Sequence, residues 1–222
     1  MGYDLTIGVN LPNILTLARI FLVPLLVAAL LADGTSLHWA DWLPVSREIF
    51  ALCVFLAAAA TDLLDGYLAR RLGQVTTVGT LLDPIADKLL VSAALVSLVD
   101  IHRIPAWMVI LIIGREFAVS GLRSIASAGG YTIAASDLGK SKMAAQVAAI
   151  ALVIGSIRWT WLGDLATIGM WVVMLFGIVS AGDYFRTFWR RVDDTVKLRR
   201  RRELLRMERR KKRSALTSEQ TI

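Results

Sequence analysis

Residues 61–90 read TDLLDGYLARRLGQVTTVGTLLDPIADKLL, and this stretch places four aspartates between long apolar segments. Asp62 and Asp65 are three residues apart, so they share one face if their segment is helical. Asp83 and Asp87 are four residues apart in the next segment, which gives the same result. The connection between the two segments is short, so the helices should be antiparallel neighbours. The sequence therefore predicts that four carboxylates converge at one depth of a helical bundle.

Such a group of carboxylates needs positive charge among them, because unneutralised charges near a low-dielectric bilayer are very unfavourable. Carboxylate oxygens favour hard cations, so Mg²⁺ or Mn²⁺ is expected first and Ca²⁺ after them. The sequence offers no Cys/His cluster for zinc, since His38 and His102 fall in predicted loops. The alternative is structural: the acids would form helix-end salt bridges with Arg70, Arg71 and Lys88.

The rest of the chain has the composition of a membrane protein. Its 222 residues are 56% hydrophobic, and the mean hydropathy is +0.59. The single cysteine, Cys53, excludes an internal disulfide framework. Apolar windows long enough to span a bilayer predict one all-α integral membrane domain with six transmembrane helices. The predicted spans are residues 11–32, 48–69, 80–100, 104–127, 141–157 and 162–185.

The distribution of charge and tryptophan predicts an orientation. If the six spans alternate, Arg70/Arg71, the segment from Arg123 to Lys142 and the C-terminal tail all fall on one side. By the positive-inside rule, that side is the cytoplasm. Both termini and the four aspartates are then cytoplasmic. The sequence thus predicts a multi-pass protein of the inner (plasma) membrane. Tryptophans near the opposite ends have the pattern of an aromatic belt. They are Trp39, Trp42, Trp107, Trp159 and Trp161.

The C-terminal segment differs from the rest of the chain. From Arg186 to Ile222 there are 14 Lys/Arg and 5 Asp/Glu, a net charge of +9, although the whole chain carries only +7. We therefore divide the chain into a six-helix transmembrane domain, residues 1–190, and a basic cytoplasmic tail, residues 191–222. On a protein already in a membrane, anionic lipid is the nearest polyanion, so we expect the tail to bind lipid and not nucleic acid.

Eight positions of the opening stretch match a longer pattern, D-x2-D-G-x2-A-R-x8-G-x3-D-x3-D. They are Asp62, Asp65, Gly66, Ala69, Arg70, Gly79, Asp83 and Asp87. This pattern resembles the signature of the CDP-alcohol phosphotransferase family, with no position missing. The resemblance covers roughly residues 11–185. It implies six transmembrane helices, a divalent-metal site open to the cytoplasm, and a donor that carries CDP.

The resemblance also implies roles for the aspartates. Asp62, Asp65 and Asp83 would be the main metal ligands, and Asp87 would touch a second ion or act as the base. Two cations would neutralise charge on the pyrophosphate and on the leaving CMP. The glycines let a substrate approach closely, and Arg70 can pair with phosphate. Residues assigned to the CDP-linked donor are Asp62, Gly66, Ala69, Arg70 and Gly79, with Asn13 and Thr16, for which helix capping and packing are equal explanations.

Four further segments resemble the phosphatidylglycerophosphate synthase branch of that family. They are LPNILTLARI (11–20), LLDPIADKLLV (81–91), GREFAVSGLRSIA (114–126) and LGKSKMAAQ (138–146). This resemblance implies transfer of the phosphatidyl group from CDP-diacylglycerol to glycerol 3-phosphate, and the family often forms homodimers. Within the family, inositol phosphate or phosphatidylglycerol is the alternative acceptor. From another class, the alternative is a divalent-cation transporter, although its acids should be spread along the membrane depth.

An anionic acceptor such as glycerol 3-phosphate needs cations near the metals. The candidates are Arg115, Arg123, Lys140 and Lys142. Arg115 and Arg123 are eight residues apart in the fourth predicted span, close to one face, and the two lysines open the fifth span. Anchoring of the helices at the cytoplasmic surface is the alternative explanation for these four charges.

Overall fold

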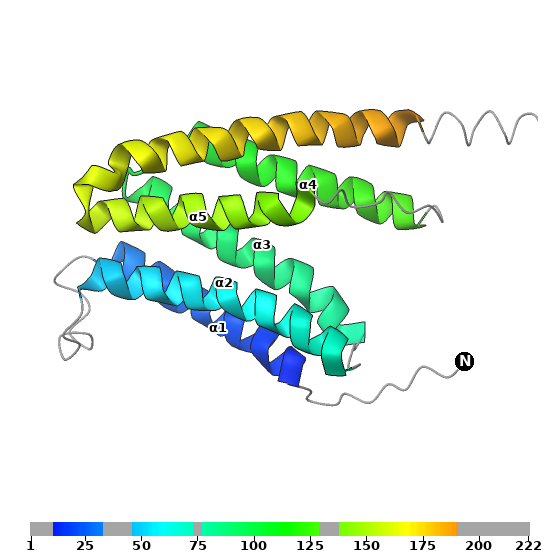
Figure 1. The fold of residues 1–222 in the computed structure, drawn as a ribbon, viewed down its shortest axis with the longest axis horizontal. Helices are drawn as coiled ribbons and strands as arrows, with labels where there is room; N and C mark the ends of the chain where they lie inside the picture. The colour runs from blue at the N-terminus through cyan, green and yellow to red at the C-terminus, as the bar shows by residue number, and fades with distance from the viewer. Residues whose placement is uncertain (1–10, 33–45, 73–76, 129–137, 191–222) are drawn as a thin grey trace, which may run out of the picture. The chain divides into compact units, whose positions relative to one another are not determined.

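The computed structural model describes residues 11–32, 46–72, 77–128 and 138–190. Side chains at 11–13, 62–72, 77–84 and 138–141 lie outside the described residues. The helices are α1 (Leu11–Leu31), α2 (Arg47–Leu72), α3 (Thr77–Asp100), α4 (Ala106–Ala128) and α5 (Leu138–Arg158). A short 3₁₀ turn, η2 (Thr160–Leu162), leads into a final helix over residues 163–190 (Figure 1). The predicted all-α class is confirmed, since the described part of the chain contains helices and no strand.

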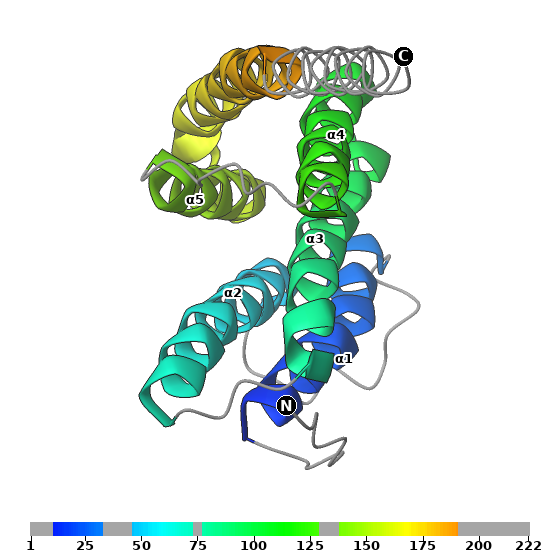
Figure 2. The same cartoon turned by 90° about the vertical axis from the view of Figure 1, so that its right-hand side faces the viewer.

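The chain divides into two compact units. The first contains residues 1–116 and 135–178, and the second contains residues 117–134 and 179–222. In the first unit, α1 contacts both α2 and α3, and α5 contacts the same two helices. Figures 1 and 2 show α1 and α2 side by side along most of their length. Helix α2 also contacts α3, so the two helices that carry the four aspartates of the predicted site are neighbours.

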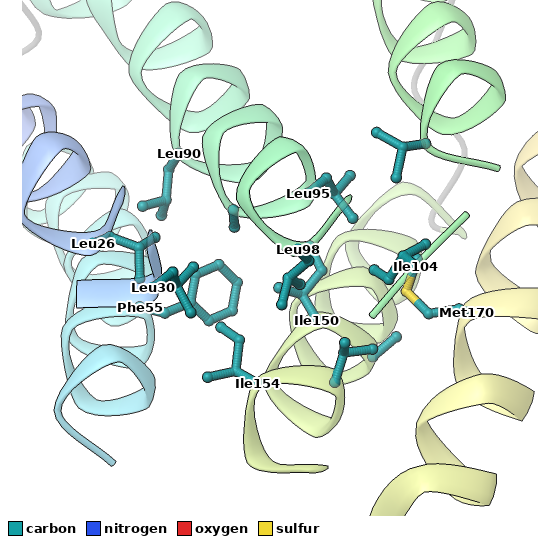
Figure 3. Close-up of a cluster of buried hydrophobic side chains, with 14 of the residues drawn as sticks. Leu26, Leu30, Phe55, Leu90, Leu95, Leu98, Ile104, Ile150, Ile154 and Met170 are labelled. Atoms are coloured by element: carbon teal, nitrogen blue, oxygen red, sulfur yellow. The ribbon is translucent and has the colours of Figure 1, made fainter. Parts of the chain in front are cut away.

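The core of the first unit follows the helical period of the sequence. On α1, the buried positions Val23, Leu26 and Leu30 recur at intervals of three and four. Phe55 from α2 is fully buried against them (Figure 3). The other labelled side chains of the cluster come from α3, α5, the turn after α3 and the final helix: Leu90, Leu95, Leu98, Ile150, Ile154, Ile104 and Met170. Met108, Val109 and Ile112 of α4 complete the cluster, so all six described helices contribute to the core.

The outer surfaces of the helices are also apolar. Phe21 is 75% exposed on α1, Ile110 is 68% exposed on α4, and Trp161 is 76% exposed at η2. Large exposed apolar side chains are unfavourable in water, and their number here is that of a protein surrounded by lipid. Two segments of the described residues are long and apolar enough to cross a membrane, Ile14–Leu31 and Thr160–Arg190.

The end of α3 is built on a left-handed residue. His102 has a φ of 59°, its amide donates to the Val99 carbonyl at 2.9 Å, and the Arg103 amide donates to the Leu98 carbonyl at 2.9 Å. This pair of hydrogen bonds is the Schellman arrangement that ends many helices, usually with glycine at the left-handed position. His102 is exposed in this turn, so its predicted place in a loop between two helices is confirmed.

Helix α3 begins earlier than the predicted span, at Thr77. A proline is compatible with the first turn of a helix and also with an interior position, where it can kink the helix. Because α3 already includes residues 77–83, Pro84 lies inside the helix. Asp83 and Gly79 are consequently helical positions and not part of a loop.

Candidate functional site

The two aspartate pairs lie on two helices that contact each other. Asp62 and Asp65 are in α2, and Asp83 and Asp87 are in α3. The predicted helical spacing of both pairs is therefore confirmed, since all four positions are helical. The side chains of Asp62, Asp65 and Asp83 lie outside the described residues, so their convergence stays a prediction.

Asp87 is the member of the set whose side chain is described. It is half-buried and follows Ala86, which is completely buried, while Leu90 one turn later is 2% exposed. Asp87 therefore stands at the border of the buried face of α3. The described side chains include no group of three or more His, Cys, Asp or Glu that could hold a metal ion, and three of the four predicted ligands lie outside that part. As a donor set, four carboxylates on adjacent helices suit a hard divalent cation.

The residues assigned to the CDP-linked donor fall on three helices. Thr16, in α1, is 1% exposed, and Arg19 one turn later is completely buried. Both belong to the buried face of α1, which contacts α2 and α3. The remaining donor residues occupy helical positions whose side chains lie outside the described residues: Asn13, Gly66, Ala69, Arg70 and Gly79.

Arg115 is the most deeply placed of the three predicted acceptor cations whose side chains the structure describes. Its side chain is 10% exposed, and its Nη2 lies 2.9 Å from Oε1 of Glu116. Nε and Nη2 are buried, and neither atom has a hydrogen-bond partner among the described residues, so the contact with Glu116 is an ion pair without hydrogen-bond geometry. On the 163–190 helix, Gly177 is buried directly beside the guanidinium.

Lys142, on α5, reaches the same part of the 163–190 helix. Its Nζ lies 6.0 Å from the centre of the Phe176 ring, at the outer limit of a cation–π contact. Arg115 and Lys142 therefore contact two adjacent residues, Gly177 and Phe176, although they come from different helices. The Lys140 side chain, predicted for the same site, lies outside the described residues.

Arg123 belongs to the second unit, where it contacts Tyr184 of the 163–190 helix. Its Nε donates a hydrogen bond to the Tyr184 hydroxyl at 3.3 Å, and its Cζ lies 5.7 Å from the ring centroid. The Arg123 side chain is exposed, in contrast to that of Arg115.

Three residues that contact the predicted cations were not found from the sequence. They are Phe176, Gly177 and Tyr184, all on the 163–190 helix. Phe and Gly are ordinary residues of an apolar helix, and no local pattern distinguishes these two from their neighbours. Only the arrangement of the helices reveals the contacts, since more than 30 residues separate the partners in the sequence.

Comparison with known proteins agrees with the motif. The family described as CDP-alcohol phosphatidyltransferase matches residues 9–179. A protein of Bacillus subtilis (strain 168) named CDP-diacylglycerol–glycerol-3-phosphate 3-phosphatidyltransferase is 45% identical over 185 residues, which cover 81% of this chain and 95% of that protein. A Rickettsia bellii protein of the same name is 36% identical over 183 residues, which cover 80% of this chain and 94% of that protein. A cardiolipin synthase (CMP-forming) of Oryza sativa is 34% identical over 82% of this chain, but over only 58% of its own length.

The match extends over most of the chain, includes all eight positions of the aspartate pattern, and fits an all-helical fold in which α2 and α3 are neighbours. The chain therefore belongs to the CDP-alcohol phosphatidyltransferase family.

Proposed function

We propose that this chain transfers the phosphatidyl group from CDP-diacylglycerol to glycerol 3-phosphate, which gives phosphatidylglycerophosphate and CMP. It is thus a transferase of phospholipid synthesis. The observation that carries this proposal is the 45% identity with a relative of that name, over 81% of this chain and 95% of the relative. Phosphatidylglycerol is the less favoured acceptor, because the cardiolipin synthase match covers 58% of that relative.

The reaction forms a bond between a hydroxyl oxygen of glycerol 3-phosphate and the phosphorus that carries diacylglycerol, and it breaks the bond between that phosphorus and the oxygen of CMP. Asp87 accepts the hydroxyl proton, and CMP leaves with the electron pair of the broken bond. The half-buried position of Asp87 on α3 suits a base that must meet both water and substrate. Most of the catalytic effect is positioning and charge stabilisation, as in other phosphoryl transfers.

Two Mg²⁺ or Mn²⁺ ions would be held by Asp62, Asp65, Asp83 and Asp87, and when bound they supply charge neutralisation for the pyrophosphate and the leaving CMP. The support is the donor set, four carboxylates in adjacent helices α2 and α3. Gly66, Ala69, Arg70 and Gly79 would bind the donor from the same two helices, with Asn13 and Thr16 from α1.

The acceptor phosphate binds to Arg115 and Lys142, with Lys140 and Arg123 as further cations. Arg115 supports this assignment best, because its Nε and Nη2 are buried without a hydrogen bond among the described residues. Glu116 offsets the charge of the guanidinium, but the buried N–H groups of Arg115 still lack hydrogen-bond acceptors among the described residues, and the phosphate anion of the substrate brings acceptor oxygens. The net charge of Arg115, Glu116 and Lys142 is +1, which favours such an anion.

All six helices cross the bilayer, with the aspartates and both termini in the cytoplasm. Support comes from the two apolar segments, from the exposed apolar side chains, and from Trp107, Trp159 and Trp161, which are exposed where α4 begins and α5 ends. Trp39 and Trp42, like the tail 191–222, lie outside the described residues. The tail binds anionic lipid, and the protein is a homodimer of the inner membrane.

An acceptor assay tests the activity. The protein is reconstituted with radiolabelled CDP-diacylglycerol and Mg²⁺, and glycerol 3-phosphate, inositol phosphate or phosphatidylglycerol is offered in separate reactions. We expect CMP release and a new lipid product with glycerol 3-phosphate, and loss of both when the divalent ions are chelated. No CMP release with any acceptor, together with Mg²⁺ flux into liposomes, would establish the transporter alternative instead.

The orientation is tested with single cysteines. In a Cys53→Ser background, we expect Arg103→Cys and Arg158→Cys to react with an impermeant maleimide from outside the cell, and Arg190→Cys to react only after the membrane is opened. The reverse pattern would overturn the proposed orientation, and reaction of all three from outside would overturn the six-helix topology.

A further inference from the structure

We propose that Gly177 is a positioning residue for the acceptor: its lack of a side chain determines where the Arg115 guanidinium lies. This inference rests on the proposed function, in which Arg115 binds the phosphate of glycerol 3-phosphate. A Cβ atom at position 177 would lie 2.9 Å from Nε of Arg115 and 3.5 Å from its Cζ and Nη2. The first distance is shorter than the contact distance of non-bonded carbon and nitrogen atoms, so any other residue at 177 must displace the guanidinium.

Gly177 and Glu116 both lie beside the guanidinium. Glu116 pairs with Nη2 at 2.9 Å, while Nε, Cζ and Nη2 lie within 3.5 Å of the position that a Cβ of residue 177 would take. Nε and Nη2 are buried and lack hydrogen-bond partners among the described residues, so this position leaves donor atoms for an oxyanion. Phe176, next to Gly177, holds the second cation, because its ring centre is 6.0 Å from Nζ of Lys142.

A structural role in helix packing is the competing explanation, because small residues let membrane helices approach closely. The neighbours of Gly177 argue against it. All three of the nearest atoms to an added Cβ belong to the Arg115 side chain, and none belongs to a backbone. At Gly169 on the same helix, an added Cβ would meet Ala149 of α5, including its backbone Cα. This is the contact expected where a glycine lets two helices pack closely. Gly177 therefore makes room for a guanidinium and not for a helix.

The end of an arginine side chain is flexible, so an alanine at 177 should move the guanidinium and leave the helices in place. Alanine also favours the helical state by about 1 kcal/mol over glycine, so the change should not weaken the 163–190 helix. The consequence falls on the acceptor site, since a displacement of about 1 Å in a binding group has large kinetic effects.

The experiment compares Gly177→Ala with Gly182→Ala in the full-length protein. Gly182 lies on the same helix, so both substitutions should raise the helix propensity equally. An added Cβ at 182 meets nothing within 4 Å, so this variant lacks the contact with a guanidinium. We expect Gly177→Ala to raise the KM for glycerol 3-phosphate about tenfold. The KM for CDP-diacylglycerol and the midpoint of thermal unfolding should match those of Gly182→Ala.

A double-mutant cycle shows whether Gly177 acts through Arg115. In an Arg115→Ala background, Gly177→Ala should have no further effect on the KM for glycerol 3-phosphate. In an Arg115→Lys background its effect should also shrink, because lysine carries no guanidinium at the contact. An unchanged KM in Gly177→Ala, an effect that persists without Arg115, or a lowered unfolding midpoint with both KM values raised would each overturn the proposal.

A binding measurement separates this proposal from the proposed function. If the wild-type protein releases no CMP with glycerol 3-phosphate, the proposed function has failed, and the contact is then tested with inorganic phosphate alone. Phosphate should raise the unfolding midpoint of the wild type and of Gly182→Ala, but not of Gly177→Ala. Equal stabilisation of all three, or of none, would show that Gly177 does not shape an anion site.

Discussion

The Arg123 guanidinium is held by Tyr184 in two ways. Its Cζ lies 5.7 Å from the centroid of the Tyr184 ring, and its Nε donates a hydrogen bond of 3.3 Å to the Tyr184 hydroxyl. The ring attracts the cation, and the hydroxyl fixes its direction, because a hydrogen bond is more directional than a cation–π contact. Tyr184 therefore limits the positions that an otherwise exposed arginine can take.

Tyr184→Phe should weaken acceptor binding modestly. The variant keeps the ring and removes the hydroxyl, so it tests the hydrogen bond alone. An exposed hydrogen bond contributes about 0.5–1 kcal/mol, which corresponds to a two- to fivefold rise in the KM for glycerol 3-phosphate if Arg123 contacts the acceptor. Steady-state kinetics with acceptor as the varied substrate measure this. An unchanged KM in Tyr184→Phe and also in Arg123→Ala would remove Arg123 from the acceptor site.

Asp87→Asn should abolish most turnover. Asparagine has nearly the shape of aspartate but cannot take up the acceptor's proton or supply its negative charge. A general base typically contributes a factor of about 10²–10⁴, so we expect kcat to fall by at least that much. Release of labelled CMP measures the loss.

The matched control for Asp87→Asn is Asp164→Asn. Asp164 is an exposed acid near the start of the 163–190 helix, far along the sequence from the aspartate pattern. This variant should keep the wild-type rate. If Asp87→Asn retained a rate within a few fold of Asp164→Asn, Asp87 would be neither base nor essential ligand.

His102→Gly should stabilise the fold. A non-glycine residue in the left-handed region lowers the stability of the fold by about 1–2 kcal/mol, and glycine removes this strain. Part of the resulting gain in stability is lost, because glycine has more conformational freedom in the unfolded chain. The expected net gain is about 0.5–1 kcal/mol, seen as a higher unfolding midpoint in detergent. His102→Ala keeps the Cβ that causes the strain, so it should give no gain. A lower midpoint for His102→Gly would mean that the histidine side chain itself supports the turn.

Removal of the residues after Val192 should leave turnover intact. The family match ends at residue 179, so the tail lies beyond the part of the chain that the family shares. In mixed micelles, the truncated protein should release CMP at the full-length rate. A peptide of residues 193–222 should bind vesicles that contain anionic lipid, and more weakly as salt rises. Complete loss of activity in a folded truncated protein would contradict this division.

The sequence alone was enough for the helical class and for the approximate ends of the helices that the structure describes. An apolar segment is a local property of the sequence, so each described helix lies close to a predicted segment. The aspartate pattern was also readable, because residues three and four apart share a helix face whatever surrounds them. The start of α3 was less predictable, since Pro84 is compatible with both a first turn and an interior position.

The surroundings of the cations were decided only by the tertiary structure. Arg115 and Lys142 could be named from their charge in an apolar context, but their contacts with Gly177 and Phe176 join distant parts of the chain. The sequence around a glycine in an apolar helix does not reveal whether another helix or a guanidinium packs against it. Composition and spacing are properties of one segment, whereas the position of a charged group depends on which segments the core brings together. For this protein the sequence determined the chemistry that is available, and the packing of the 163–190 helix decided where its cations lie.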